Sequence, residues 1–355
     1  MTLLDPEAVD CDVHPALVST RQLAPFLDDH WREMLHIRNI DNLELTSFPP
    51  RAELFGRPDW RLAHGKPGSD LGRMQGDLLD HFGMKFAIAN VLYGAQAVYN
   101  EYIGAALCSA INDWLAAEWL ARDTRLRASI VVSLVNPQTA AEEVERMAED
   151  KRFVQVMVLA MGEVPLGRKQ FWPIYQAAER HGLPIGIHAG SMYRHAPTQS
   201  GFPSYLVEDY AAQTQGFVAQ ALSFVAEGVF TKFPELKVVL IESGVTWMPS
   251  LMWRCSKDWL GARIELPWVK TAPANILRDH FRMTLQPFDG PPDPADVERL
   301  INQFGSEDMF LFSTDYPHWQ FDGDDALPSG LPAPLKRKFL VDNPMKTYSR
   351  LSEAT

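Results

Sequence analysis

Residues 183–188 read LPIGIH and residues 309–315 read MFLFSTD. Each is a short apolar run that ends in a titratable side chain, His188 in the first and Asp315 in the second. Strands buried on both faces, as in a parallel sheet, have this nearly continuous apolar composition. The sequence therefore predicts eight strands, because six more such runs occur, at residues 8–14, 85–92, 128–134, 153–160, 237–242 and 281–285.

Helical patterns separate most of these runs. Pro137 suits the first turn of a helix, and Gly182 suits the residue after a helix end. Repeated alternation of strand and helix predicts an α/β fold, a (β/α)₈ barrel formed by a single domain that spans residues 1–355. Apolar residues recur at helical spacing within residues 107–121, 138–149, 169–181, 213–230, 247–261 and 296–304.

Three stretches are longer than a minimal barrel requires, namely residues 18–80, 189–212 and 316–334. Each follows the carboxyl end of a predicted strand, the face on which such barrels build their active sites. We expect these insertions to form the walls or lids of an active-site pocket.

The composition is that of a globular protein, with 46% hydrophobic and 22% charged residues and a net charge of −12. Nucleic acids and anionic membranes attract basic surfaces, so neither is an expected partner. The three cysteines lie far apart and form no CxxC pair, which argues against a disulfide framework and a thiolate zinc site. No apolar run reaches the roughly 18 residues of a membrane span, and no signal-peptide pattern is visible. We expect a cytoplasmic protein.

Four potential metal ligands stand at strand ends. Asp12 and His14 are two positions apart in a strand and so point to the same face. His188 and Asp315 each follow an apolar run, where a polar group is costly without a partner. Taken singly, each residue also has an ordinary interpretation, as a turn residue, a buried histidine or a capping aspartate. Together they predict a site for Zn²⁺, Mn²⁺ or Fe²⁺ at the carboxyl ends of the strands.

The same segments resemble the amidohydrolase superfamily, specifically the amidohydrolase-related branch that includes aminocarboxymuconate semialdehyde decarboxylase, resorcylate-type decarboxylases and related hydrolases. The resemblance implies a metal held by Asp12, His14, His188 and Asp315, with Asp315 taking a proton from metal-bound water in hydrolytic members. No lysine ends the run at 153–160, so the carboxylated lysine of binuclear hydrolases is absent. The motifs that carry the resemblance are DVH at 12–14, GIHAG at 186–190, FPELKVVLIESGVTWMP at 233–249 and FSTDYPHW at 312–319.

Two positions depart from the family pattern. Asp12 stands where the family often has His or Glu, and Glu242 stands where the decarboxylases have a histidine that acts on the substrate. Glu242 has two interpretations, as an acceptor that orients a ligand imidazole or as a further metal-binding and catalytic carboxylate. The second gives three carboxylates and two imidazoles, enough for two metals, as in the O₂-dependent hydroxylases of this branch.

Residues after the fifth and eighth strands supply candidates for substrate binding. Arg194 could pair with a substrate carboxylate, and aromatic side chains could line a pocket. The loop histidines could instead supply further metal ligands, and every one of these residues could be an ordinary loop side chain. The substrate-binding candidates are Tyr193, Arg194, His195, His318 and Trp319.

These features predict an enzyme acting on a small, carboxylated or aromatic organic substrate with one or two divalent metals. Hydrolysis by metal-activated water is the leading reaction, with Asp315 as base and His188 as ligand or neighbour of the developing charge. Non-oxidative decarboxylation is a second reaction, and a dinuclear Fe or Mn oxygenase that needs an electron donor is the alternative. A further hypothesis is that the chain is a metal-binding subunit without catalytic activity. The resemblance implies a homodimer, or a hetero-oligomer with a related subunit.

Overall fold

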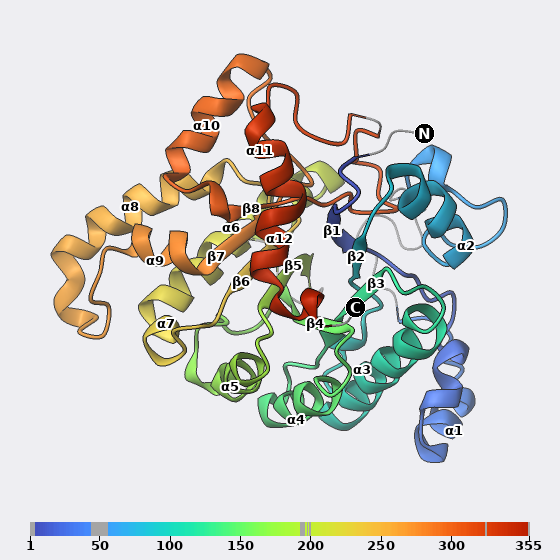
Figure 1. Cartoon of the computed structure of the whole chain (residues 1–355). Helices are drawn as coiled ribbons and strands as arrows, with labels where there is room; N and C mark the ends of the chain where they lie inside the picture. The colour runs from blue at the N-terminus through green and yellow to red at the C-terminus, as the bar shows by residue number, and fades with distance from the viewer. Residues whose placement is uncertain are drawn as a thin grey trace.

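The computed structural model describes residues 4–43, 56–191, 196, 198, 200–323 and 325–353. Its centre is one sheet of eight parallel strands in chain order, so the predicted (β/α)₈ architecture is confirmed (Figure 1). Every predicted strand coincides with an observed one. The strands are β1 Val9–Val13, β2 Phe86–Ala89, β3 Leu126–Val131, β4 Phe153–Met161, β5 Ile185–Ser191, β6 Val238–Ile241, β7 Phe281–Thr284 and β8 Phe310–Leu311.

Backbone hydrogen bonds join β1 to the segment that directly follows β8, which closes the barrel. Cys11 N donates to Phe312 O at 3.0 Å, and Asp315 N donates to Asp12 O at 3.0 Å. His14 N donates to Tyr316 O at 2.8 Å. The closure therefore places the ends of β1 and β8 side by side, although they lie 301 positions apart at His14 and Asp315.

Helices surround the strands in Figure 1. Pro137 opens α4, and the Asn136 side chain before it accepts hydrogen bonds from Gln138 N and Thr139 N. The helix α6 begins seven residues before its predicted start, inside the segment expected as a loop. The α-helices are α1 Asp29–Ile37, α2 Leu71–Met74, α3 Glu101–Leu115, α4 Pro137–Met147, α5 Trp172–Arg180, α6 Leu206–Ala226, α7 Val229–Lys232, α8 Trp247–Ala262, α9 Pro273–His280, α10 Val297–Phe304, α11 Ala333–Arg337 and α12 Asn343–Thr347.

Apolar side chains are buried on both sides of the sheet. The larger cluster combines strand and helix residues. The smaller one combines side chains from β1, β2, β4, β6 and β8, which can meet only inside the closed sheet. Tyr348 and Leu351 from the C-terminal segment join this interior cluster. The interior is therefore a packed core, as expected for this fold.

Part of the first insertion lies against the carboxyl ends of β1 and β8. Arg57 N donates to Pro317 O at 2.8 Å, and the ring of Trp60 lies 4.7 Å from that of Tyr316. Gly68 adopts φ +80°, and a Cβ there would lie 2.4 Å from His14 O, so only glycine fits this close approach.

None of the described helices is both long and apolar enough to cross a membrane.

Candidate metal centre

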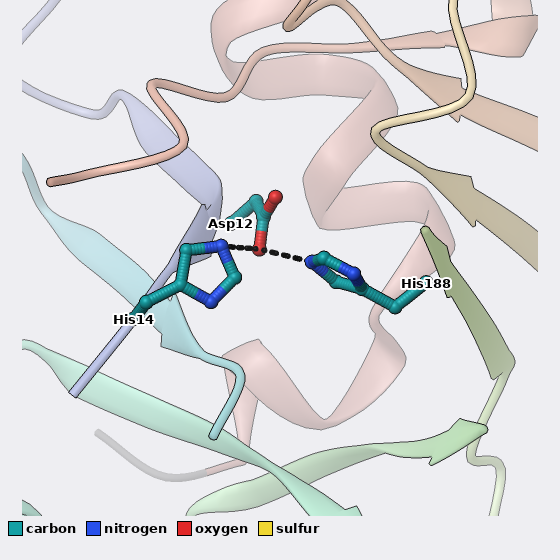
Figure 2. Close-up of side chains that lie close together, drawn as sticks. All are labelled: Asp12, His14 and His188. Atoms are coloured by element: carbon teal, nitrogen blue, oxygen red, sulfur yellow. Dashed lines mark ion pairs between the residues drawn. The ribbon is translucent and has the colours of Figure 1, made fainter. Parts of the chain in front are cut away.

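Three of the four predicted ligands converge on one point at the carboxyl ends of the strands. Figure 2 shows the rings of His14 and His188 approaching the Asp12 carboxylate from opposite sides. The Nε2 atoms of His14 and His188 lie 3.3 and 3.6 Å from Asp12 Oδ1. The fourth, Asp315, places Oδ1 at 2.9 Å from His14 Nε2. The structure thus brings together all four side chains that the sequence singled out.

Several buried polar atoms in this cluster have no hydrogen-bond partner among the described residues. Asp12 Oδ2, His188 Nε2 and Asp315 Oδ2 lack a hydrogen bond, although all three side chains are fully buried. Burying such groups without a partner is costly, and a coordinated cation would satisfy them. Nitrogen and carboxylate ligands suit Zn²⁺, Mn²⁺ or Fe²⁺. The residues present therefore fit a divalent metal.

Backbone carbonyl groups orient both imidazoles. His14 Nδ1 lies 2.8 Å from Asn90 O, and His188 Nδ1 lies 2.6 Å from Ala189 O. A carbonyl can only accept, so each neutral ring carries its proton on Nδ1. The Nε2 lone pair of each ring then faces the cluster. This is the tautomer that a metal ligand requires.

The charges of the cluster also favour a cation. Burial acts to raise the pKa of Asp12, but attraction to His14 and His188 outweighs it and the pKa is lowered. Burial acts to lower the pKa of His14, but attraction to Asp12 and Asp315 outweighs it and the pKa is raised. Both directions have one cause, which is that the carboxylates stabilise positive charge at this point.

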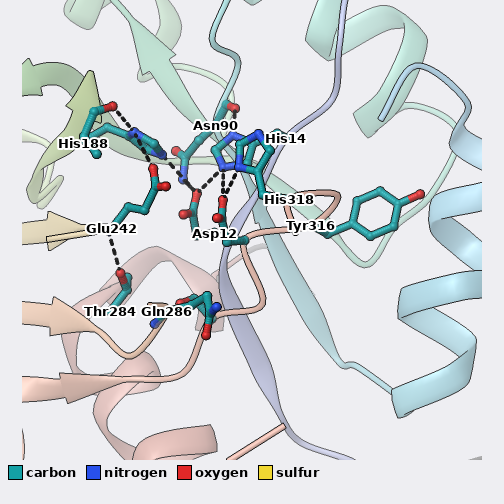
Figure 3. Close-up of polar contacts among 12 residues, drawn as sticks. Asp12, His14, Asn90, His188, Glu242, Thr284, Gln286, Tyr316 and His318 are labelled. Atoms are coloured by element: carbon teal, nitrogen blue, oxygen red, sulfur yellow. Dashed lines mark hydrogen bonds and ion pairs between the residues drawn. The ribbon is translucent and has the colours of Figure 1, made fainter. Parts of the chain in front are cut away.

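Glu242 is the fifth member of the site. It follows β6, its side chain is 8% exposed, and its Oε2 lies 3.8 Å from His188 Nδ1 (Figure 3). Its backbone N donates to Thr284 Oγ1 at 3.0 Å. Burial, with repulsion from Asp315 and Asp12, raises the pKa of Glu242 well above its ordinary value. The Glu242 carboxyl therefore holds its proton beside the cluster more firmly than an exposed glutamate does.

Two site carboxylates stand in strained backbone conformations. Glu242 has φ +60° and Asp315 has φ +58°. This left-handed region is unfavourable for residues with a Cβ and is often found at functional sites. The strained turn directs each carboxylate into the site, Glu242 directly after β6 and Asp315 four residues after the end of β8.

Asp10 holds the ends of β1 and β8 together behind the ligands. Its carboxylate accepts hydrogen bonds from Thr314 Oγ1 at 2.6 Å, Thr314 N at 3.0 Å and Asp12 N at 3.1 Å. Burial raises the pKa of Asp10 to about 7. Thr314 directly precedes Asp315, so one buried carboxylate positions the backbone beside two ligands.

His318 belongs to the metal-ligand cluster. Its Nδ1 lies 2.6 Å from Asp315 Oδ1, and its ring stacks on His14 with centroids 4.7 Å apart. Asp12, His14 and His188 form one group with metal-ligand spacing, and His14, Asp315 and His318 form a second that shares His14. This contact matches the open interpretation of His318 as a further ligand more closely than that of a substrate contact.

The other substrate-binding candidates are less well placed or lie outside the described residues. Trp319 is 50% exposed. Tyr193, Arg194 and His195 lie outside the described residues.

Asn90 is a site residue that the sequence reasoning missed. Its Nδ2 donates to Asp12 Oδ1 at 2.8 Å while its backbone carbonyl faces His14 Nδ1 (Figure 3). A signal was present, because Asn90 is a polar residue inside the apolar run KFAIANVL at 85–92. Such a residue in a buried strand needs a partner.

Comparison with known proteins agrees with the fold. A family model described as amidohydrolase matches residues 9–350. The γ-resorcylate decarboxylase of Polaromonas sp. (strain JS666) is 26% identical over 261 residues, which cover 69% of this chain and 76% of that protein. The crystal structure of 5-carboxyvanillate decarboxylase from Sphingomonas paucimobilis superposes with a TM-score of 0.70 at 20% identity, covering 97% and 99% of the two chains. A dihydroxybenzoic acid decarboxylase from Polaromonas sp. JS666, solved with manganese and 2-nitroresorcinol, gives 0.66 at 20% identity, covering 97% of each chain.

Proposed function

This chain belongs to the amidohydrolase family, and from that premise we propose that it is a metal-dependent decarboxylase of a small, hydroxylated aromatic carboxylate. The similar proteins named above, which are decarboxylases of aromatic acids, support this reaction class. Hydrolysis, the leading reaction from the sequence, stays a prediction. The choice between the two reactions depends on what the site offers to the reacting atoms.

The observation that carries the proposal is the buried carboxyl of Glu242, which lies 3.8 Å from His188 Nδ1 and whose pKa burial and the neighbouring carboxylates raise. Hydrolysis needs a base next to the attacking water. Non-oxidative decarboxylation needs an acid: the bond between ring carbon and carboxylate breaks, its electron pair stays on the ring carbon, and one proton replaces the departing CO₂. A buried acid with a raised pKa can deliver that proton at neutral pH.

The remaining residues have separate tasks in this proposal. Asp12, His14, His188 and Asp315 would hold the metal. When bound, a divalent metal would draw the substrate carboxylate and a neighbouring hydroxyl oxygen to the site and stabilise negative charge. The contact of His318 with Asp315 Oδ1 holds this carboxylate in place. Asp315 Oδ2 forms no hydrogen bond with the described residues, so it can face a metal. Thr284 holds the backbone of Glu242.

The test measures CO₂ release from 2,6-dihydroxybenzoate, 5-carboxyvanillate and related hydroxybenzoates by protein loaded with Mn²⁺, Zn²⁺ or Fe²⁺. In D₂O, each product molecule should gain one deuterium at the ring carbon that lost CO₂. The variant Glu242→Gln should keep its metal by elemental analysis but lose turnover by about 10²-fold or more, because the amide cannot give up a proton in this way. If metal-loaded protein released CO₂ from none of these acids, the proposal would fail.

A second candidate function, a dinuclear oxygenase, is favoured by the excess of carboxylates and by the second ligand group that includes His318. Ionised Asp12, Asp315 and Glu242 would carry three negative charges, which two divalent metals balance better than one. This enzyme would consume O₂ and need an electron donor. Two equivalents of Fe or Mn per chain, one lost in Glu242→Gln, with substrate-dependent O₂ uptake, would favour it over decarboxylation.

A further inference from the structure

A line of buried hydrogen bonds leads from the Asp12 carboxylate across the barrel interior to the C-terminal segment. Asn90 Nδ2 donates to Asp12 Oδ1 at 2.8 Å, and Ser129 Oγ donates to Asn90 Oδ1 at 2.6 Å. Gln155 Nε2 donates to Ser129 Oγ at 2.8 Å, and Tyr348 Oη donates to Gln155 Oε1 at 3.2 Å. We call these four residues, Asn90, Ser129, Gln155 and Tyr348, the interior chain.

Every member of the interior chain is fully buried and comes from a different element. Asn90 follows β2, Ser129 lies on β3, Gln155 lies on β4, and Tyr348 precedes the last helical turn. Their surroundings are apolar, since Tyr348 packs with the interior cluster of strand residues. Polar side chains in such a core lower stability unless each finds a partner, and these find one another.

All four hydrogen bonds run in the same direction. Each donor points toward Asp12 and each acceptor points away from it, from the Tyr348 hydroxyl to the Asn90 amide. Hydrogen bonds arranged head to tail polarise one another, so the last donor is more positive than an isolated amide. A neutral line of side chains thereby stabilises the negative charge of Asp12 without placing a cation in the core.

The backbone makes room for this arrangement. A Cβ on Gly186 would lie 2.5 Å from Cδ of Gln155, so the strand that carries His188 has a glycine where the Gln155 side chain crosses. Asn90 is also held by its own backbone, because its N donates to Val13 O at 2.8 Å. The backbone therefore fixes Asn90 and leaves room for Gln155, and Asn90 Nδ2 holds the Asp12 carboxylate in one orientation.

We infer that the interior chain sets how tightly Asp12 holds the metal, with Tyr348, three hydrogen bonds away from Asn90, acting as a positioning residue. This inference rests on the metal site in the proposed function. Groups behind a metal ligand typically change metal affinity by about 10- to 100-fold when removed. Removing Ser129 Oγ cuts the line next to Asn90, whereas removing the Tyr348 hydroxyl takes away only its far end.

The experiment measures Mn²⁺ affinity by titration calorimetry on metal-depleted full-length protein. Ser129→Ala should weaken binding by about 10-fold, and Tyr348→Phe by about threefold, because each bond passes on only part of its polarisation. Tyr175→Phe is the matched control: it removes a buried hydroxyl that donates to Leu166 O on the outer side of the sheet and should leave affinity unchanged. Circular dichroism and thermal unfolding confirm that each variant is folded.

The double variant Ser129→Ala/Tyr348→Phe decides whether Tyr348 acts through the line. If it does, the double variant binds Mn²⁺ as weakly as Ser129→Ala alone, because the line is already cut. A further threefold loss in the double variant, or an unchanged affinity in Tyr348→Phe, would overturn the inference while leaving the metal site in place. If the parent protein bound no Mn²⁺, Zn²⁺ or Fe²⁺, the proposed function would fail first, and the inference with it.

Discussion

The two ends of the barrel both bury charged groups, but they treat them differently. We call the carboxyl ends of the strands, with Asp12, His14, His188, Glu242 and Asp315, the rim. We call the amino ends, where Arg127, Arg282 and Arg350 are buried, the floor. At the floor the guanidinium groups donate mainly to backbone carbonyls, including Phe153 O, Phe281 O and Leu126 O. At the rim, Asp12 Oδ2, Asp315 Oδ2 and His188 Nε2 form no hydrogen bond within the part of the chain that the structure describes.

This difference indicates that the buried charges of the floor have a structural role, whereas those of the rim have a functional role. A buried cation that donates to carbonyl groups completes the backbone hydrogen bonding at the strand starts and has few donors left for a ligand. Nε of Arg350 is an exception, since it has no hydrogen-bond partner within the described ranges. A buried carboxylate with a free oxygen is costly in the folded protein and reactive toward a cation. Backbone strain follows the same division. Among the described residues, the non-glycine positions with positive φ on strand ends, Glu242 and Asp315, are both at the rim.

The largest effect is expected from Asp315→Asn at the rim. The amide has nearly the shape of the carboxylate, so the fold should persist, but it loses the charge that would bind the metal. Turnover should fall by about 10³-fold, because the metal that stabilises negative charge in the reaction would be held poorly. The measurement is kcat together with metal content and circular dichroism. Full activity with bound metal would show that Asp315 has no part in the chemistry.

Arg350→Met at the floor should lower the stability of the fold and leave turnover unchanged. The guanidinium donates to Phe153 O at 2.8 Å and also to Ala148 O, and the variant leaves both buried carbonyls without these donors. The free energy of unfolding should fall by about 3 kcal/mol. Turnover per folded molecule and metal content should stay unchanged. Denaturant unfolding and steady-state kinetics check this, and a selective loss of kcat would erase the distinction between the two ends.

Metal addition should stabilise the protein through the rim alone. Mn²⁺ at 100 times its dissociation constant should raise the free energy of unfolding by about 2.7 kcal/mol, since the unfolded chain lacks the site. The same increment is expected in Arg350→Met, because distant sites contribute additively. Unfolding curves with Mn²⁺ and with a chelator test both statements. An increment that disappears in the floor variant would mean that the two ends are coupled.

The smallest effect concerns Asp308, which lies just before β8 at the floor. Lys338 and Lys346 lie 2.6 Å from its two oxygens and lower its pKa from 3.8 to about 2. Because the pKa of Asp308 is lower in the folded than in the unfolded protein, its ionised carboxylate stabilises the fold at pH values above the unfolded pKa. This contribution is lost as the pH falls from about 4 toward 2. Asp308→Asn should cost under about 1 kcal/mol at pH 7, because the pair is partly exposed, and less at pH 3. Urea unfolding at the two pH values measures the difference; an equal cost at both would exclude the ion pairs as its source.

What the sequence determined by itself was the order of the strands and the chemical type of their ends. Apolar runs report burial, and His188 and Asp315 were conspicuous because each ends such a run. The pair Asp12 and His14 followed from the alternation of side chains along a strand. The amidohydrolase resemblance rested on the same residues. The predicted cytoplasmic location, assembly and hydrolytic reaction stay predictions.

The tertiary structure alone decided which polar groups meet. Sequence patterns are local, whereas the contact of His14 with Asp315 spans 301 positions and exists because the sheet closes on itself. The proximity of Glu242 to His188 depends on a left-handed turn after β6 that no residue preference announces in a glutamate. The placement of Asn90 behind Asp12, and of His318 on Asp315, likewise follows from how the strands wrap around one interior.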